Sequence, residues 1–445
     1  MADNGPFTRR EFMAVTGAAA AAASVLPHAP AWGAETAKRR RYALVGTGVR
    51  GNSMWGRGLV ERYRDEVEFV GLCDLNPLRV EFAKKSLGVS CPTFTRLDDM
   101  LDKAKPDLLM VTTVDNTHQE CIVKALDRGL DVITEKPMVV DEDQCRAVLD
   151  AEKRSGKKIV VTFNYRFAPK HQKIKEVLLS GDVGRISSVD FSWYLDTSHG
   201  ADYFRRWHRL REKGGSLWVH KATHHFDLVN WWLDADPVEV SAFASLNTYG
   251  KKGPFRHTHC RPCPHKSQCS YYWDITKNPR LVALYVDSES ADGYLRDGCV
   301  FREDVDIPDT MNAIVKYSTG VTMSYSLNTF MPVEGYRLAF NGTKGRLEIR
   351  DYERQPWEVA EETEIHLTRN FGKREKVEIP KAEGGHGGGD DRLRDLIFRN
   401  PTVPEYMKLP GSRAGAMSCL TGIAARKSAE QEGRPVEISE LLKAT

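Results

Sequence analysis

The chain has 445 residues, 41% of them hydrophobic, which is enough for two domains with separate cores. Its formal net charge of +3 is too small to indicate a nucleic-acid-binding protein. Four of its nine cysteines are scattered through the first half, a distribution that does not suggest a disulfide framework.

The first 34 residues have the layout of an export signal. Arg9 and Arg10 precede an alanine-rich apolar run, and Ala29–Ala31 offers a cleavage site. The arginine pair and its neighbours resemble the twin-arginine motif, with Ala14 where Lys is usual. We therefore expect residues 1–34 to direct export to the periplasm through the twin-arginine machinery. The alternative is a tail in which the pair occurs by chance.

No membrane anchor is expected. The apolar run of the signal is too short and too weakly hydrophobic to span a bilayer, and no later segment has about 18 apolar residues in succession. The first cysteine is Cys73, which argues against a lipoprotein anchor.

A glycine-rich turn follows the first predicted strand. Tyr42–Val45 are apolar, and Gly46, Gly48 and Gly51 then form the pattern G-x-G-x-x-G before a predicted helix. In a dinucleotide site the first glycine makes a tight turn, the second lets a pyrophosphate approach the backbone, and the third lets helix and strand pack closely. The helix N-terminus also favours phosphate charge. The pattern predicts a dinucleotide site, the alternative being an ordinary tight turn.

The second predicted strand ends in an acidic residue. The run 67–74 closes with Asp74, whose position after the glycine turn suits a hydrogen bond from a ribose 2′-hydroxyl. A carboxylate there would repel a 2′-phosphate, so the sequence favours NAD, with NADP less favoured. Arg79 lies close enough in sequence to weaken that preference.

Strands and helices continue to alternate up to about residue 160. Segments 107–113, 131–137 and 157–166 read as strands, whereas 118–129 and 141–155 read as helices. Repeated units of this length predict a doubly wound parallel sheet over residues 38–160.

Several motifs together resemble the Gfo/Idh/MocA oxidoreductase family. They are the G-x-G-x-R-G turn, Thr113 with His118 after the fourth strand, Glu135-Lys136-Pro137, and segments 163–169, 178–193, 342–349 and 419–438. The likeness covers nearly all of residues 40–440. It implies an α/β Rossmann domain followed by an α+β domain, residues 161–445, built on a large, mostly antiparallel open sheet. The face of that sheet often forms a subunit interface, so a homo-oligomer is expected.

The resemblance also implies which residues contact the cofactor. These residues are Gly46, Gly48, Arg50, Gly51, Asp74, Thr113, His118, Glu135 and Lys136. Hydride transfer needs a group that takes the hydroxyl proton, and Lys136 matches the family lysine beside the nicotinamide and the substrate hydroxyl. A nearby positive nicotinamide disfavours the ammonium form, as a base requires. The alternative is a surface pair of Glu135 and Lys136 before a turn.

A second polar cluster lies on a helix predicted within residues 214–232. His220 and His224 are four residues apart, hence on one helix face. The family has Asp and His at this spacing, so His224 matches its acid/base histidine and His220 replaces its Asp. A second imidazole would not orient His224 as a carboxylate does, and Lys221 is expected to supply part of that polarity. Packing against aromatic neighbours and a zinc-binding histidine pair are the alternatives.

Substrate contacts are predicted from nearby polar and aromatic residues. The candidates are Tyr165, Arg166, Lys221 and His225, and the segment 196–209 is rich in groups that suit a sugar ring. A solvated loop explains that segment equally well. Residues 384–390, with His386, look like a lid or substrate loop.

A dense Cys/His segment marks an insert at about residues 255–275. Cys260, Cys263 and Cys269, with a nearby His or Cys299, could close a tetrahedral zinc site. An iron–sulfur cluster, or a disulfide with one free thiol, is the alternative. In each case we expect a structural staple and no part in hydride transfer.

These features predict an NAD-dependent enzyme that oxidises a ring hydroxyl, such as that at C3, of a sugar or glycoside. Because an exported protein lacks a free NAD pool, the cofactor is expected to stay tightly bound. The alternatives are a redox-neutral NAD-dependent glycosidase or epimerase, and a non-catalytic sugar-binding protein on the same fold. The intact glycine turn, Lys136 and His224 argue against the last.

Overall fold

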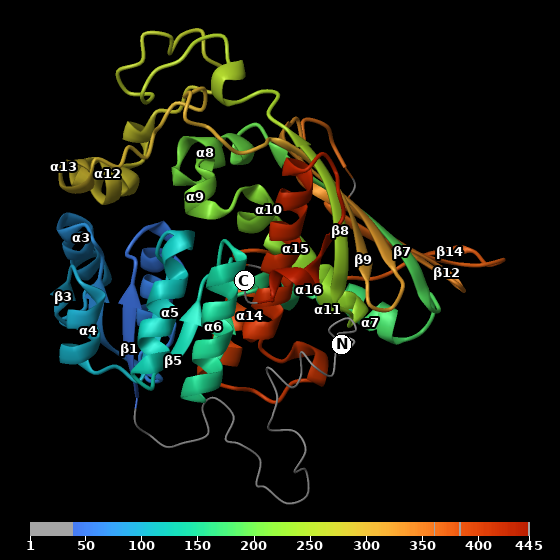
Figure 1. Ribbon diagram of the computed structural model, residues 1–445, viewed down its shortest axis with the longest axis horizontal. Coiled ribbons are helices and arrows are strands. Elements are labelled where there is room, and N and C mark those ends of the chain that lie inside the picture. The colour runs from blue at the N-terminus through green and yellow to red at the C-terminus, as the bar shows by residue number, and fades with distance from the viewer. Residues whose placement is uncertain (1–38, 360, 382–383, 444–445) are drawn as a thin grey trace, which may run out of the picture.

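The computed structural model describes residues 39–359, 361–381 and 384–443, and the predicted export signal lies outside them. The described chain forms two sheets with helices between and around them (Figure 1). The first sheet belongs to the N-terminal part of the chain and the second to the C-terminal part. The predicted division into a Rossmann part and a large-sheet part is confirmed at the level of fold class.

The first sheet has six parallel strands in the order β3-β2-β1-β4-β5-β6. The strands are β1 (Arg40–Val45), β2 (Val67–Cys73), β3 (Thr93–Phe94), β4 (Leu108–Val111), β5 (Asp131–Thr134) and β6 (Ile159–Val161). The central strands are almost continuously apolar because helices cover both faces of the sheet. The strand predicted over 157–166 is shorter than expected, since the chain turns into a 3-10 helix at Asn164–Phe167.

The helices of this part include α6, whose two ends follow local capping signals. They are α2 (Gly58–Arg62), α3 (Pro77–Leu87), α4 (Leu97–Ala104), α5 (His118–Asp127) and α6 (Glu142–Ser155). Asp141 caps α6 by accepting a hydrogen bond from the Gln144 N–H at 2.8 Å. Gly156 ends the same helix in the left-handed conformation, directly after the helix predicted over 141–155.

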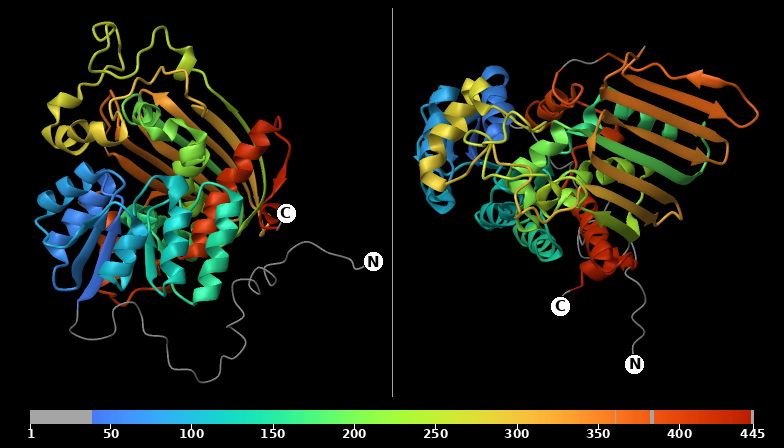
Figure 2. Two further views of the ribbon diagram at one scale, coloured as in Figure 1. Left: turned by 60° about the vertical axis from the view of Figure 1, so that its left-hand side comes forward. Right: turned by 90° about the horizontal axis from the view of Figure 1, so that it is seen from above.

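The second sheet has nine strands in the order β14-β13-β12-β11-β7-β10-β9-β8-β15. The strands are β7 (Ile186–Asp196), β8 (Pro237–Ser245), β9 (Thr310–Tyr317), β10 (Thr322–Met331), β11 (Glu334–Gly342), β12 (Gly345–Arg354), β13 (Thr363–Arg369), β14 (Arg374–Lys376) and β15 (Val436–Glu437). Every neighbouring pair is antiparallel except β7 with β10. Buried and exposed residues alternate along β9, so one face is packed and the other is open (Figure 2).

Helices of the C-terminal part lie between the open sheet and the Rossmann sheet (Figure 1). They are α7 (Pro169–Leu179), α8 (His199–Arg205), α9 (Arg211–Gly214), α10 (Leu217–His220), α11 (Ala222–Leu233), α14 (Gly389–Phe398), α15 (Ser412–Glu430) and α16 (Ile438–Leu441). Leu393, Ile397 and Phe398 of α14 share a hydrophobic cluster with Tyr42 and Trp55 of the first domain. The two domains are therefore joined by a common core.

The insertion is larger than the segment predicted from its cysteines. Ser245 at the end of β8 pairs with Thr310 at the start of β9, so the chain between them is an excursion from a hairpin. This excursion carries α12 (Pro279–Tyr285) and α13 (Glu289–Asp292), which reach back to the Rossmann domain above α3 (Figure 1).

The packing of α15 against α10 predicts an unusual response to an alanine substitution. Gly→Ala in a helix interior ordinarily stabilises a protein by about 1 kcal/mol. A Cβ on Gly422 would lie 2.2 Å from the backbone oxygen of Trp218, so Gly422→Ala should destabilise by about 1–3 kcal/mol in urea unfolding. Gly415→Ala is the comparison on the same helix, because a Cβ there would meet only side-chain atoms, Met138 Sδ and Val161 Cγ2, both at 2.9 Å, and no backbone oxygen. Equal midpoints for Gly422→Ala and wild type would contradict the expectation.

Candidate active site

The predicted site residues converge where the parallel strands end and the second domain begins. Loops after β1, β2, β4, β5 and β6 meet the segment α10–α11 and the turn before α14 at this edge. The carboxyl ends of parallel strands are where open α/β sheets bind ligands.

The glycine turn after β1 has the close contacts that a dinucleotide turn requires. Gly46 has φ +88°, and a Cβ added there would lie 2.5 Å from the carbonyl carbon of Thr112. A Cβ on Gly51 would lie 2.1 Å from the Gly46 oxygen. These clashes leave only glycine at either position, so the backbone approaches its neighbours closely and the turn fits a pyrophosphate.

Asp74 is buried and holds the turn in place. Its Oδ2 accepts hydrogen bonds from the Thr47 N–H at 2.8 Å and from the Thr47 hydroxyl at 3.0 Å. Its Oδ1 accepts from the Asn76 N–H at 2.9 Å and from Arg79 at 3.2 Å. Arg79 also pairs with Asp292 at 2.8 Å, so two carboxylates balance the cation that the sequence placed near the ribose site.

Glu135 is buried and pairs with Arg50 instead of forming a surface pair with Lys136. Arg50 Nε donates to Glu135 Oε1 at 2.7 Å, and the Trp55 indole N–H donates to the same oxygen at 2.6 Å. Arg50 also reaches Asp390 at 3.5 Å. The surface-pair alternative is therefore wrong, because both acceptor and donors are enclosed at the domain junction.

Lys136 bridges the two domains. It follows β5, and its Nζ donates a hydrogen bond to the backbone oxygen of His220 at 2.9 Å. Removal from water lowers the pKa of Lys136 to about 8, although Asp115 and Glu135 oppose that shift. The lysine is thus anchored through one N–H, and its neutral form becomes populated as the pH approaches about 8.

Asp115 supplies a carboxylate that the sequence seemed to lack. Its Oδ2 lies 2.5 Å from His220 Nδ1, and both side chains are buried. Burial raises the pKa of the Asp115 carboxyl, although the nearby charges of Lys136 and Arg206 oppose that rise and favour its ionised form. Burial lowers the pKa of the His220 imidazole, which disfavours its charged form. Sequence reasoning missed Asp115, although an acidic residue between Thr113 and His118 at the end of a parallel strand was the available signal.

The helix predicted to carry both histidines is broken. His220 ends α10, Lys221 lies between the two helices, and His224 belongs to the first turn of α11. Ser216 starts α10 with φ +76°, and its side chain accepts a hydrogen bond from the Trp218 N–H at 3.3 Å. The prediction of one continuous helix is therefore wrong. The pattern of apolar residues continues across the break and gave no sign of it.

His224 is buried against an aromatic wall. Its ring stacks on Tyr165 with centroids 4.3 Å apart, and its Nδ1 has no hydrogen-bond partner among the described residues. Burial lowers the pKa of His224 well below its usual range, and the charges of Lys136 and Lys221 lower it further. His224 is therefore a neutral imidazole whose buried Nδ1 lacks a partner among the described residues.

The four residues predicted to bind substrate differ in their placement. Tyr165 faces the site, and Lys221 donates to its hydroxyl at 3.3 Å. Arg166 instead forms a two-point salt bridge to buried Asp227, at 2.7 and 2.5 Å. His225 is enclosed, with Nδ1 2.7 Å from the Tyr325 hydroxyl. The geometry therefore directs Arg166 and His225 to structural contacts.

His118 and Thr113 line the loop after β4. His118 Nδ1 lies 2.8 Å from the Pro137 oxygen and Nε2 lies 3.2 Å from the Thr113 oxygen, so this imidazole ties the loop to the Glu135-Lys136-Pro137 segment. The Thr113 hydroxyl is 2.8 Å from that of Thr117. These contacts position the cofactor-side loop.

His386 lies over the same site, from the far end of the chain. Its ring is 5.5 Å from that of Tyr165, and its Nδ1 is 3.0 Å from Asp390. Although burial opposes it, the hydrogen bond from His386 and the charge of Arg50 hold the pKa of Asp390 well below its usual range. The described part of the predicted lid loop is thus a turn fixed to the glycine turn through Arg50.

The cysteines of the insertion surround a small cavity but are not arranged as a metal site. Cys260, Cys263, Cys269 and Cys299 all line it, and all are free thiols. Among the described residues no group of three His, Cys, Asp or Glu side chains could hold a metal ion. The structural zinc predicted from Cys260, Cys263 and Cys269 is therefore without support. Backbone hydrogen bonds Cys260–Asp297 (2.8 Å) and Cys299–Thr258 (3.1 Å) join the ends of the insertion instead.

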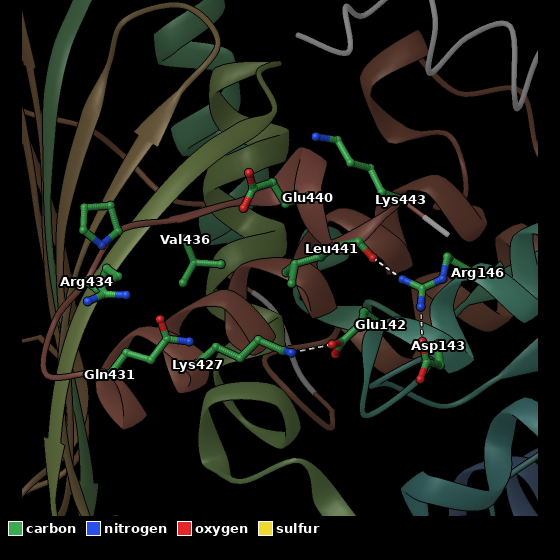
Figure 3. A pocket seen from close by; sticks show the side chains of 11 residues that line it. Glu142, Asp143, Arg146, Lys427, Gln431, Arg434, Val436, Glu440, Leu441 and Lys443 are labelled. Atoms are coloured by element: carbon green, nitrogen blue, oxygen red, sulfur yellow. Dashed lines mark hydrogen bonds and ion pairs between the residues drawn. The ribbon is translucent and has the colours of Figure 1, made fainter. Parts of the chain in front are cut away.

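A separate surface cavity of about 430 Å³ lies at the C-terminal end of α15 (Figure 3). Its charged groups are largely paired: Lys427 reaches Glu142 at 2.5 Å, and Arg146 pairs with Asp143. The residues predicted for catalysis do not line it. No helix in the described ranges is long and apolar enough to cross a membrane.

Comparison with known proteins agrees with this architecture. YteT of Bacillus subtilis (strain 168) is 40% identical over 423 residues, which is 90% of this chain and 98% of YteT. The inositol 2-dehydrogenase/D-chiro-inositol 3-dehydrogenase of Lactiplantibacillus plantarum is 23% identical over 209 residues, 47% of this chain and 56% of that enzyme. A levoglucosan dehydrogenase solved with NADH and levoglucosan shares the fold, with a TM-score of 0.64, 17% identity, and coverage of 90% of this chain and 100% of the other.

Two family models cover most of the chain. Residues 40–163 match the NAD-binding Rossmann fold of the GFO_IDH_MocA oxidoreductases, and residues 175–438 match the C-terminal alpha/beta domain of the same family. The chain therefore belongs to the Gfo/Idh/MocA oxidoreductase family and carries its NAD-binding Rossmann domain.

Proposed function

We propose that this chain is an exported NAD-dependent oxidoreductase that acts on a ring hydroxyl, such as that at C3, of a sugar, glycoside or cyclic polyol. The observation that carries the proposal is the placement of Lys136, with a pKa lowered to about 8, beside neutral His220 and His224 at the strand ends. The names of the inositol and levoglucosan dehydrogenases support the substrate class. Asp74, with Arg79 balanced by two carboxylates, favours NAD over NADP.

The residues that would hold the cofactor are the glycine turn, Asp74 and the loop of Thr113 and His118. Bound NAD would supply the acceptor for the hydride on the carbinol carbon. Neutral Lys136, held by its bond to the His220 oxygen, takes the proton of the substrate hydroxyl. Tyr165, Lys221 and His386 form the wall against which the ring lies.

A redox-neutral glycosidase or epimerase is the second candidate. Elimination and re-addition at a sugar ring need proton-transfer groups beyond the one that serves hydride transfer. His224, with an unpartnered nitrogen, and the His386–Asp390 pair provide such groups on the same wall. An exported protein gains from either reaction if its NAD is recycled within the site.

Export by residues 1–34 and assembly through the open face of the second sheet belong to the same proposal. The arginine pair supports the first, and the exposed Phe243 and Ile314 on that sheet support the second. Comparison of the periplasmic fraction for the wild type and for Arg9→Lys/Arg10→Lys tests export, and light scattering of the purified protein tests assembly.

Product analysis distinguishes the two candidate reactions. Purified protein is incubated with aryl glycosides without added NAD, and both the aglycone and keto-sugars are measured. For the oxidoreductase, a keto-sugar without cleavage is expected. Its amount should not exceed one equivalent per bound NAD unless a second sugar is reduced and regenerates the NAD. Repeated aglycone release would instead identify the glycosidase. Protein that contains NAD but forms neither product would refute both.

The lowered pKa of Lys136 predicts a pH profile. Since the neutral amine is the base, kcat/KM for oxidation should rise with pH through about 8 and then level off. Lys136→Met should lower kcat by about 10²–10⁴-fold. A profile that is flat from about pH 6 to about pH 10, or an active Lys136→Met variant, would remove Lys136 from this role.

Removal of the Asp115 carboxylate should change that profile in a defined direction. Asp115 raises the pKa of Lys136, so Asp115→Asn should move the rising limb of kcat/KM to lower pH while lowering its plateau about tenfold. Asp127→Asn, at the end of α5 and exposed, is the control. An unshifted limb with a reduced plateau would indicate that Asp115 only supports the fold.

A further inference from the structure

The end of the insertion lies on the cofactor side of the Rossmann domain. Residues 279–297 contain α12, a short 3-10 turn at Val286–Ser288, and α13. They belong to the excursion between β8 and β9 of the second domain, yet α12 packs on α3 of the first (Figures 1 and 2). This segment therefore spans from one domain to the other across the edge where the glycine turn lies.

Tyr285 reaches the glycine turn directly. Its hydroxyl accepts a hydrogen bond from the Val49 N–H at 3.1 Å, and a Cβ on Gly48 would lie 3.2 Å from the same oxygen. Val49 lies at the N-terminal end of the helix that follows the turn, where backbone N–H groups face a bound phosphate. A phenol that accepts one hydrogen bond keeps its own proton to donate, so Tyr285 can donate to a phosphate oxygen there.

Two further contacts tie the segment to the ribose side of the site. Asn76 Nδ2 donates to the Ser288 backbone oxygen at 2.9 Å. Arg79 pairs with Asp292 at 2.8 Å and with Asp74 at 3.2 Å, so one guanidinium links the segment to the carboxylate predicted to bind the ribose. The contacts of residues 279–297 thus fall on both the phosphate and the ribose sides of the turn.

The other end of the segment is fixed to the second domain. Arg261 binds Asp297 and also pairs with Glu289. Arg296 pairs with Asp202 of α8 at 2.8 Å. Asp297 is fully buried, so loss of Arg261 would leave that carboxylate as an unpaired buried charge. The segment is therefore fixed through Arg296 and Asp297, while Tyr285 contacts the glycine turn.

We infer that residues 279–297 form a clasp that closes the dinucleotide site and retains the cofactor in the folded protein. The inference rests on the proposed function only in requiring NAD in the glycine turn. Release of the dinucleotide requires the contacts of Tyr285, Ser288 and Asp292 to open first. A cofactor enclosed in this way is carried along with the folded chain and does not exchange at each turnover.

The test measures cofactor retention separately from catalysis. NAD released by acid from purified, dialysed protein gives the occupancy, and the fluorescence of bound NADH during displacement by excess NAD gives the off-rate. Tyr285→Phe, which removes one hydroxyl, and Asp292→Asn, which removes the negative charge that pairs with Arg79, should each raise the off-rate about fivefold to tenfold. The double variant should lose its bound NAD during dialysis.

Asp287→Asn is the matched control. Asp287 lies on the same segment, is exposed and forms no ion pair within the described residues, so its off-rate should equal that of the wild type. Both test substitutions are conservative, and thermal unfolding checks that each variant folds. Off-rates equal to wild type in folded Tyr285→Phe and Asp292→Asn would overturn the clasp, as would wild-type protein that holds no NAD. Retention of NAD without turnover of any sugar would leave the clasp standing and refute the proposed function.

Discussion

The candidate active site depends on one lysine, Lys136, whose side chain is largely removed from water at the junction of the two domains. Lys136 comes from the end of a Rossmann strand, whereas the oxygen that accepts its hydrogen bond belongs to His220 of the second domain. An ammonium group in such a place is stable only if nearby carboxylates offset its lost hydration. Asp115 and Glu135 do so incompletely, which leaves the pKa near 8. The domains must be docked for this value to be set, so the fold and the chemistry share one interface.

The carboxylates around this lysine come from different parts of the chain, and each already has a partner. Glu135 binds Arg50, Asp115 binds His220, and Asp390 binds His386. Such pairing keeps buried charge low while leaving proton-transfer groups within one small region. The family resemblance implies an Asp at position 220, where this chain has His220. Asp115 of the Rossmann domain supplies a carboxylate beside that position instead. His220 connects this carboxylate to α10.

Features encoded locally were predictable from the sequence, whereas features created by docking were not. The glycine turn, the cap at Asp141 and the parallel strands follow from spacing and residue type over a few positions. The Asp115–His220 contact joins residues from two domains, and the pattern around residue 220 gave no sign of it. Arg166 looked available for a substrate because its partner Asp227 is distant in sequence. The break at Lys221 was hidden for a similar reason, since tertiary packing overrides the local helix signal there.

The clasp that we infer from residues 279–297 connects cofactor retention to the proposed export. Under the proposed export in folded form to a compartment where free NAD is scarce, the chain needs slow NAD dissociation more than fast exchange. Slow dissociation does not require more contacts within the Rossmann domain, because an element that must move before the ligand can leave has the same effect. Residues 279–297 are such an element, anchored on α8 and bonded to Val49, Asn76 and Arg79. A closed cofactor side would leave the face of Tyr165, Lys221 and His386 as the route for substrate. Under the proposed function, a retained NADH is then reoxidised within the site, either by a second sugar or by the intermediate of a redox-neutral reaction.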